Sequence, residues 1–162
     1  NKALTMLKLC GNGISDKGAQ HIGEGLKNNK ALTMLNIERN KIGAEGAQHM
    51  GEVLSATASV QKDRSTSARL KSNTVLTTLD LSENEIGDEG AQHISEALKI
   101  NTVLTTLDLS KNEIGDEGAQ HISEALKINK ALASLDLGAS PCRLSPSPGH
   151  VEGKIGAEGA MH

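Results

Sequence analysis

The sequence predicts an α/β solenoid in which short parallel strands line the concave face of a horseshoe arc and helices cover the convex face. Residues 76–103 recur almost unchanged as residues 104–130, and more divergent copies begin at Leu4, Leu32 and Leu132. Successive copies start 28 residues apart, except for one step of 44 that contains a 16-residue insertion. Within a copy, apolar residues recur first every second position and then every third or fourth. Units of this kind bury their apolar faces against their neighbours.

The first part of each copy is predicted to be a strand. In the copy that begins at Leu76, Leu79 and Leu81 are two residues apart, so both point to one face of an extended segment. The residues between them are polar and point to the other face. Asn84 follows where the chain must turn, and its amide is able to pair with backbone groups that the turn leaves open.

The second part is predicted to be a helix. Asp88 is a good N-cap residue. Ala91, Ile94 and Leu98 then form one apolar stripe at helical spacing. We expect Asn101 to end the helix in the left-handed conformation.

The motif L-x-x-L-x-L-x-x-N-x-I, followed by G-D-E-G-A and a helix, resembles the leucine-rich repeat in its long, ribonuclease-inhibitor-like form. The segment GDEGAQHISEALK resembles repeats in the C-terminal arrays of NOD-like receptors. The resemblance implies a horseshoe fold and a function in protein–protein interaction. Only two cysteines occur, Cys10 and Cys142, and there is no N-glycosylation sequon. We therefore expect a cytoplasmic protein, and not ribonuclease inhibitor itself, which is rich in cysteine.

We expect residues 1–162 to form a single array of about five repeats. Their predicted bounds are 4–31, 32–75 with an insertion at 55–70, 76–103, 104–131, and 132–162 with an insertion at 140–152. The first insertion is polar and is predicted to be a mobile loop, with an extended helix as the alternative. Both insertions are also compatible with gene-model artefacts. In the second repeat Ala44 replaces the acidic residue, so we expect that helix to begin less firmly.

Composition excludes several classes of function. The net charge of −3 predicts neither nucleic-acid nor membrane binding, and no apolar run is long enough to span a bilayer. No polar capping element precedes Leu4, so we expect the chain either to be part of a longer one or to have an exposed apolar end. No cofactor, metal or catalytic activity is expected, since no phosphate-binding loop occurs and Cys10 is predicted to lie on the face opposite the histidines. A column of equivalent histidines is explained by copying of one repeat, because neighbouring helices lie roughly 10 Å apart. These are His21, His49, His93, His121 and His162.

The outward-facing strand positions form a candidate protein-binding surface. Its residues are Lys8, Asn36, Glu38, Thr78, Asp80, Ser82, Thr106, Asp108, Ser110, Ser134 and Asp136. Asp80, Asp108 and Asp136 are predicted to lie in register about 4.8 Å apart, and repel by roughly 0.9 kcal/mol per adjacent pair in water. A partner with a basic surface, or a cation, would relieve this repulsion. The alternative is that aspartate is simply common at this position and that solvent tolerates the column.

The sequence thus favours a cytoplasmic protein-recognition module of the NOD-like-receptor type. Two other interpretations stay open. One is a GTPase-activating regulator resembling the Ran GTPase-activating protein, and the other is a truncated fragment without independent function. Because the chain contains no Phe, Tyr or Trp, which anchor many interfaces, we expect it to bind weakly on its own.

Overall fold

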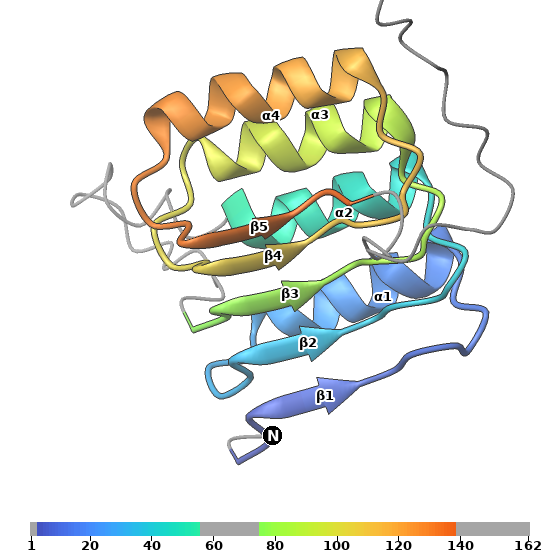
Figure 1. The fold of residues 1–162 in the computed structure, drawn as a ribbon. Coiled ribbons are helices and arrows are strands. Elements are labelled where there is room, and N and C mark those ends of the chain that lie inside the picture. The colour runs from blue at the N-terminus through green and yellow to red at the C-terminus, as the bar shows by residue number, and fades with distance from the viewer. Residues whose placement is uncertain (1–2, 56–74, 139–162) are drawn as a thin grey trace, which may run out of the picture.

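The structure, a computed structural model, describes residues 3–55 and 75–138, in which strands of three residues alternate with helices (Figure 1). The strands are β1 (Met6–Lys8), β2 (Met34–Asn36), β3 (Thr78–Asp80), β4 (Thr106–Asp108) and β5 (Ser134–Asp136). The helices are α1 (Asp16–Lys27), α2 (Ala44–Ser55), α3 (Gly87–Leu98) and α4 (Asp116–Ile128). Within these bounds, none of the helices combines the length and apolarity that crossing a membrane requires.

The strands form one parallel sheet in the order β1-β2-β3-β4-β5. Each strand pairs with the next so that equivalent residues of successive repeats lie opposite each other. The helices lie together on one side of the sheet and pack in the same order, α1 on α2, α2 on α3 and α3 on α4 (Figure 1). The predicted α/β solenoid is confirmed.

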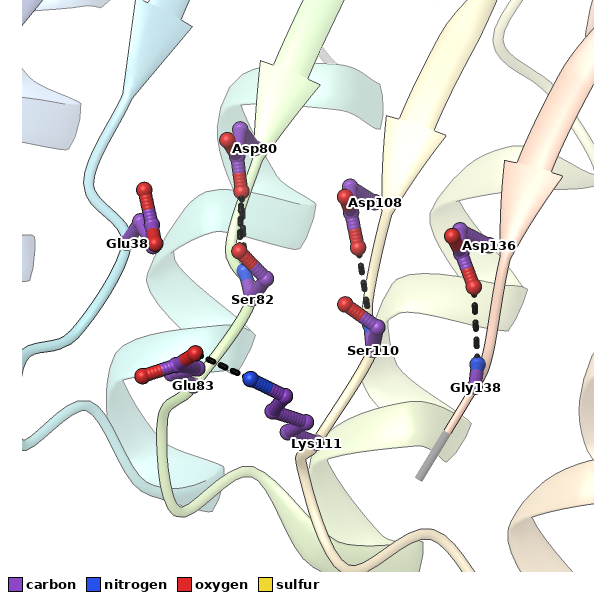
Figure 2. Close-up of a pocket in the computed structure, with 9 residues that line it drawn as sticks. All are labelled: Glu38, Asp80, Ser82, Glu83, Asp108, Ser110, Lys111, Asp136 and Gly138. Carbon is purple, nitrogen blue, oxygen red and sulfur yellow. Dashed lines mark hydrogen bonds and ion pairs between the residues drawn. The ribbon is translucent and has the colours of Figure 1, made fainter. Parts of the chain in front are cut away.

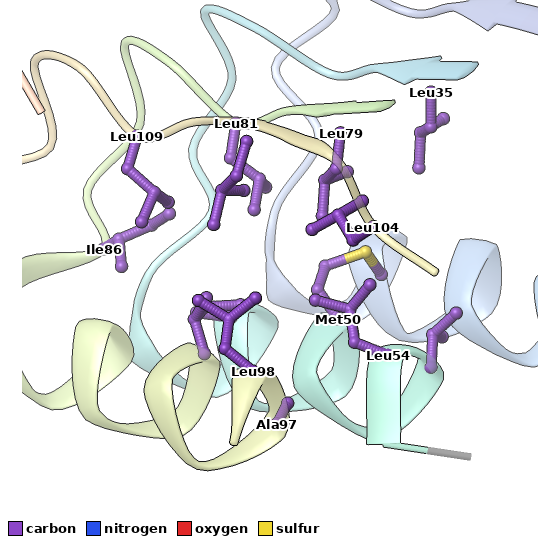
Figure 3. Packing of buried hydrophobic residues seen from close by; sticks show 14 of the residues in the cluster. Leu35, Met50, Leu54, Leu79, Leu81, Ile86, Ala97, Leu98, Leu104 and Leu109 are labelled. Atoms are coloured by element: carbon purple, nitrogen blue, oxygen red, sulfur yellow. The ribbon is translucent and has the colours of Figure 1, made fainter. Parts of the chain in front are cut away.

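The core lies between the sheet and the helices and consists of Leu, Ile, Val, Ala and Met side chains (Figure 3). Leu79 and Leu81 point inward from β3 and the residue that follows it, and Ile94 and Leu98 point inward from α3. All four are almost completely buried, as the spacing predicts. Full burial of one such side chain contributes roughly 1.5–3 kcal/mol, so the stacked layers are the main source of stability.

Buried asparagines pair with backbone groups of their own turn, as predicted for Asn84, and they also join one repeat to the next. Its Oδ1 accepts a hydrogen bond from the Ile42 N–H at 3.1 Å, and its Nδ2 donates to the Ile37 and Leu81 carbonyls at 3.1 and 2.9 Å. Each bond satisfies a backbone group that the turn leaves unpaired. Similar bonds are made by Asn40 and Asn112.

The prediction that Asp88 caps its own helix is wrong. Helix α3 begins one residue earlier, at Gly87, and the Asp88 side chain reaches across to the next repeat. Its Oδ1 accepts hydrogen bonds from the N–H groups of Gly115 and Gly118, at 2.7 and 2.9 Å. Asp16 makes the same pair of bonds to the start of α2, at the same two distances. These aspartates therefore cap the following helix, because stacking brings its open N–H groups beside them.

The expectation that α2 begins less firmly is wrong for the same reason. Helix α2 has Ala44 at its start but takes its cap from Asp16. Ala44 itself lies beside the start of α3, since a Cβ built on Gly90 would lie only 3.2 Å from the Cα of Ala44. Gly87 has a φ of +60°, whereas Gly115, at the capped start of α4, has a φ of −95°. Helix α3 therefore has alanine where α2 and α4 have the capping aspartate of the preceding repeat.

Asn101 does not adopt the predicted left-handed conformation, since it is not among the residues with positive φ. Its side chain joins neighbouring repeats instead: Nδ2 donates to the Leu54 carbonyl at 2.8 Å, and Oδ1 accepts from the Leu104 N–H at 2.7 Å. Most of the insertion predicted at 55–70, all of that at 140–152, and the continuation of the last repeat lie outside the described residues.

Candidate protein-binding surface on the concave face

Parallel pairing assembles the predicted column of aspartates. Asp80 lies opposite Asp108, and Asp108 lies opposite Asp136, on three neighbouring strands. Lys8 and Asn36 occupy the same column on β1 and β2. The side of the sheet away from the helices therefore carries a column that is cationic at β1 and acidic from β3 to β5.

Asp80 is held by hydrogen bonds to both of its oxygens. Its Oδ1 accepts from the Ser82 N–H at 3.0 Å and from the Ser82 hydroxyl at 2.6 Å. Its Oδ2 accepts from the Asn36 side-chain amide at 2.6 Å. Ser82 is itself only 6 % exposed, so its hydroxyl serves the turn and is little available to a partner.

Asp108 and Asp136 keep one oxygen open. In each, Oδ1 accepts a hydrogen bond from the backbone N–H two residues later, that of Ser110 at 2.9 Å and that of Gly138 at 2.8 Å (Figure 2). These bonds give aspartate a structural reason to occur at this position. Among the residues that the structure describes, the Oδ2 atoms of Asp108 and Asp136 have no hydrogen-bond partner.

A shallow pocket of about 310 Å³ opens at the carboxyl ends of these strands (Figure 2). Five carboxylates and one ammonium group line it, so it is strongly acidic. Its lining residues are Glu38, Asp80, Ser82, Glu83, Asp108, Ser110, Lys111, Asp136 and Gly138. The structure thus brings six of the predicted residues together, while Lys8, Asn36, Thr78, Thr106 and Ser134 do not line the pocket.

Sequence reasoning missed a row of charged residues, two of which, Glu83 and Lys111, line this pocket. Arg39, Glu83 and Lys111 occupy one position of successive repeats, with φ values of 55°, 52° and 56°. Arg39 Nε lies 3.1 Å from Glu83 Oε2, and Lys111 Nζ donates to Glu83 Oε1. The hydrogen bond from Lys111 is the main cause that holds the pKa of Glu83 below its ordinary value, with help from both positive charges. In the sequence, the alternation of positive and negative residues at this repeat position could have indicated these ion pairs.

The remaining sequence candidates do not converge. Within residues 3–55 and 75–138, no group of three or more His, Cys, Asp or Glu side chains is arranged to hold a metal ion. His21, His49, His93 and His121 lie one on each helix, and His162 lies outside the described residues. Cys10 is an exposed free thiol two residues after the end of β1.

Comparison with known proteins identifies the repeat. A family model described as "Leucine Rich repeat" matches residues 28–50, 72–95 and 101–123. A comparison with curated proteins finds no match.

Solved structures of low sequence identity share the fold. The structure entitled "Leiomodin-1 Actin-Binding Site 2 (ABS2)" superposes with a TM-score of 0.68 at 19 % identity, covering 85 % of this chain and 72 % of that one. The tropomodulin C-terminal domain of Caenorhabditis elegans superposes with a TM-score of 0.65 at 12 % identity, covering 87 % of this chain and 78 % of that one. The fold is therefore a leucine-rich-repeat solenoid.

Proposed function

We propose that this chain is a non-enzymatic protein-recognition module whose concave sheet face binds a basic segment of a partner protein. The observation that carries the proposal is the acidic pocket, in which Asp108 and Asp136 present open carboxylate oxygens on adjacent strands. Strands lie about 4.8 Å apart, so one arginine or lysine side chain is able to contact both carboxylates at once.

The ion pair of Glu83 and Lys111 supports the same proposal. Lys111 already donates to Glu83, which shows that this part of the surface accommodates an ammonium group against a carboxylate. A second cation from a partner would be attracted by the remaining carboxylates of the pocket. The chain lacks aromatic anchors, so affinity is expected to depend strongly on these charges and on ionic strength.

A lysine-rich peptide provides a direct test. Titration monitored by NMR should shift the amide signals around Asp108 and Asp136, and the shifts should vanish in the Asp108→Asn/Asp136→Asn variant. The control Glu89→Gln/Glu117→Gln removes two exposed charges from the helices and should leave the titration unchanged. Equal binding by both variants would show that the concave face is not the site.

Actin is the first protein partner to test, because one solved structure of the same fold is entitled an actin-binding site. We expect saturable binding in calorimetry that the same pair of aspartate substitutions weakens. Absence of binding would remove actin as a partner and leave the peptide experiment as the test of the surface.

The wider setting of the module is part of the proposal. The similarity of GDEGAQHISEALK to NOD-like-receptor repeats supports a cytoplasmic recognition array of the ribonuclease-inhibitor-like form, extending over residues 1–162. A full-length transcript that encodes a nucleotide-binding domain upstream would support this setting. A transcript without one would contradict it.

A further inference from the structure

The two ends of the strands carry opposite charges, although the net charge of the chain is only −3. Every helix begins on the side of the sheet where the strands end, and has an acidic residue in its first turn (Figure 1). On the side where the strands begin, the described connections from helix to strand contain three lysines and no aspartate or glutamate. These connections are residues 28–33, 99–105 and 129–133. Each sign of charge suits the nearby helix termini, and the stacking of parallel helices brings like charges together.

Two exposed isoleucines lie on this basic side. Ile100 follows the end of α3 and is 47 % exposed, and Ile128 is the last residue of α4 and is 56 % exposed. The Asn129 side chain donates hydrogen bonds to the carbonyls of Leu98 and Asn101, at 2.7 and 3.0 Å. The end of α4 therefore lies beside Ile100. Because α3 packs between α2 and α4, the exposure of Ile100 is not an effect of the end of the array.

Lysines accompany the two isoleucines. Lys127 and Lys130 are exposed and lie on either side of Ile128 in the sequence. The ion pairs of the described residues leave both lysines without a carboxylate partner, whereas Lys99 pairs with Glu96 at 2.6 Å. The surface thus combines apolar side chains with two open ammonium groups. It fits a partner that supplies carboxylates and apolar side chains together.

We infer that this surface, formed by Ile100, Lys127, Ile128 and Lys130, binds an acidic segment of a partner protein with two aliphatic side chains on one face. Equivalent residues of neighbouring repeats lie between about 4.8 Å apart, the strand spacing, and roughly 10 Å apart, the helix spacing. Aliphatic residues three or four positions apart on a partner helix have Cβ atoms roughly 5–6 Å apart, which matches this range.

A protein segment suits the surface better than an anionic bilayer does. Two isoleucines offer too little apolar surface to anchor a protein in lipid, where even one myristoyl chain binds only marginally. The inference does not depend on the proposed function, because this surface lies at the opposite end of the strands from the acidic pocket and carries the opposite charge.

A fluorescein-labelled helical peptide, made of glutamates with two leucines four positions apart, tests the inference. Its fluorescence anisotropy should rise saturably with the concentration of the 162-residue chain, and added salt should weaken binding. The Lys127→Glu/Lys130→Glu and Ile100→Ser/Ile128→Ser variants should each bind about tenfold more weakly or worse. A peptide with serine in place of both leucines should bind as weakly as the isoleucine variant shows.

Two matched controls accompany these variants. Lys17→Glu/Lys41→Glu makes the same change in net charge at exposed residues distant from the isoleucines, and Met6→Ser removes an apolar residue that is as exposed as Ile100. Both should bind the peptide as the wild type does, and circular dichroism should show every variant folded.

The inference is overturned if the wild type does not bind the peptide, or if the controls weaken binding as much as the matched variants do. It is equally overturned if the serine peptide binds as well as the leucine peptide. Vesicles containing phosphatidylserine should not bind the chain. Vesicle binding that the same lysine and isoleucine substitutions abolish would overturn the inference and assign the surface to lipid.

Discussion

Restoring the carboxylate that the second repeat lacks should stabilise the array. Ala44 stands where Asp16 and Asp88 stand in other repeats, and each of those aspartates caps the helix of the next repeat with two hydrogen bonds. In Ala44→Asp the new carboxylate would face the start of α3 and compete with the Ile86 carbonyl, 3.2 Å away, for the N–H of Gly90. The Gly87 N–H already donates a hydrogen bond to the Asn112 carbonyl. The new carboxylate would therefore bond to Gly87 only if the turn changed conformation and broke that bond.

The magnitude follows from two contributions. A side-chain cap is worth about 1 kcal/mol, with a range of roughly 0.5–2 kcal/mol. A negative charge in the first turn of α2 adds about 0.3–1 kcal/mol through the helix dipole. We therefore expect Ala44→Asp to raise the free energy of unfolding by about 1–2 kcal/mol, and the melting temperature by about 2–4 °C per kcal/mol.

Urea denaturation followed by circular dichroism measures the total, and hydrogen exchange separates its two causes. The Gly90 amide should exchange more slowly in Ala44→Asp if the carboxylate caps α3. Asp88→Ala is the reciprocal variant and should lower stability by about 1 kcal/mol, because α4 loses its cap. Unchanged protection of Gly90, even with a higher melting temperature, would refute the capping of one helix by the preceding repeat.

Three other substitutions test the buried and charged contacts. Asn84→Asp removes the amide that donates to three buried carbonyls, and should lower the free energy of unfolding by at least about 3 kcal/mol in urea denaturation. Ser95→Ala should raise it by about 1 kcal/mol, since the Ser95 hydroxyl is buried and, among the described residues, has no hydrogen-bond partner; a loss of stability would contradict this. Glu83→Gln tests the pH dependence of stability. The pKa of Glu83 is lowered in the folded protein, so its ionised form stabilises the fold fully at pH values above its ordinary pKa of 4.5. This stabilisation is lost as the pH falls through the folded-state pKa. The difference in melting temperature between wild type and Glu83→Gln should accordingly disappear in acid, and a constant difference would contradict the assignment to Lys111.

Local periodicity explains why much of the fold was predictable. A strand alternates its side chains between two faces, so Leu79 and Leu81 had to share one of them. The same spacing in every repeat brought Asp80, Asp108 and Asp136 into one column, and the column was found as expected. The sequence did not predict that one oxygen of each aspartate accepts a hydrogen bond from the backbone N–H two residues later. Such bonds depend on the backbone conformation of the turn, which residue spacing does not specify.

The sequence by itself determined the repeat, the strand and helix within it, and the identity of the inward-facing residues, because these follow from patterns a few residues long. Only the tertiary structure decided which groups of different repeats meet. Asp88 reaches Gly115 and Gly118, which are 27 and 30 residues away, and Glu83 meets Arg39 and Lys111 from the repeats on either side. Such contacts depend on how closely and in what register the repeats stack, which is set by the packing of the whole core.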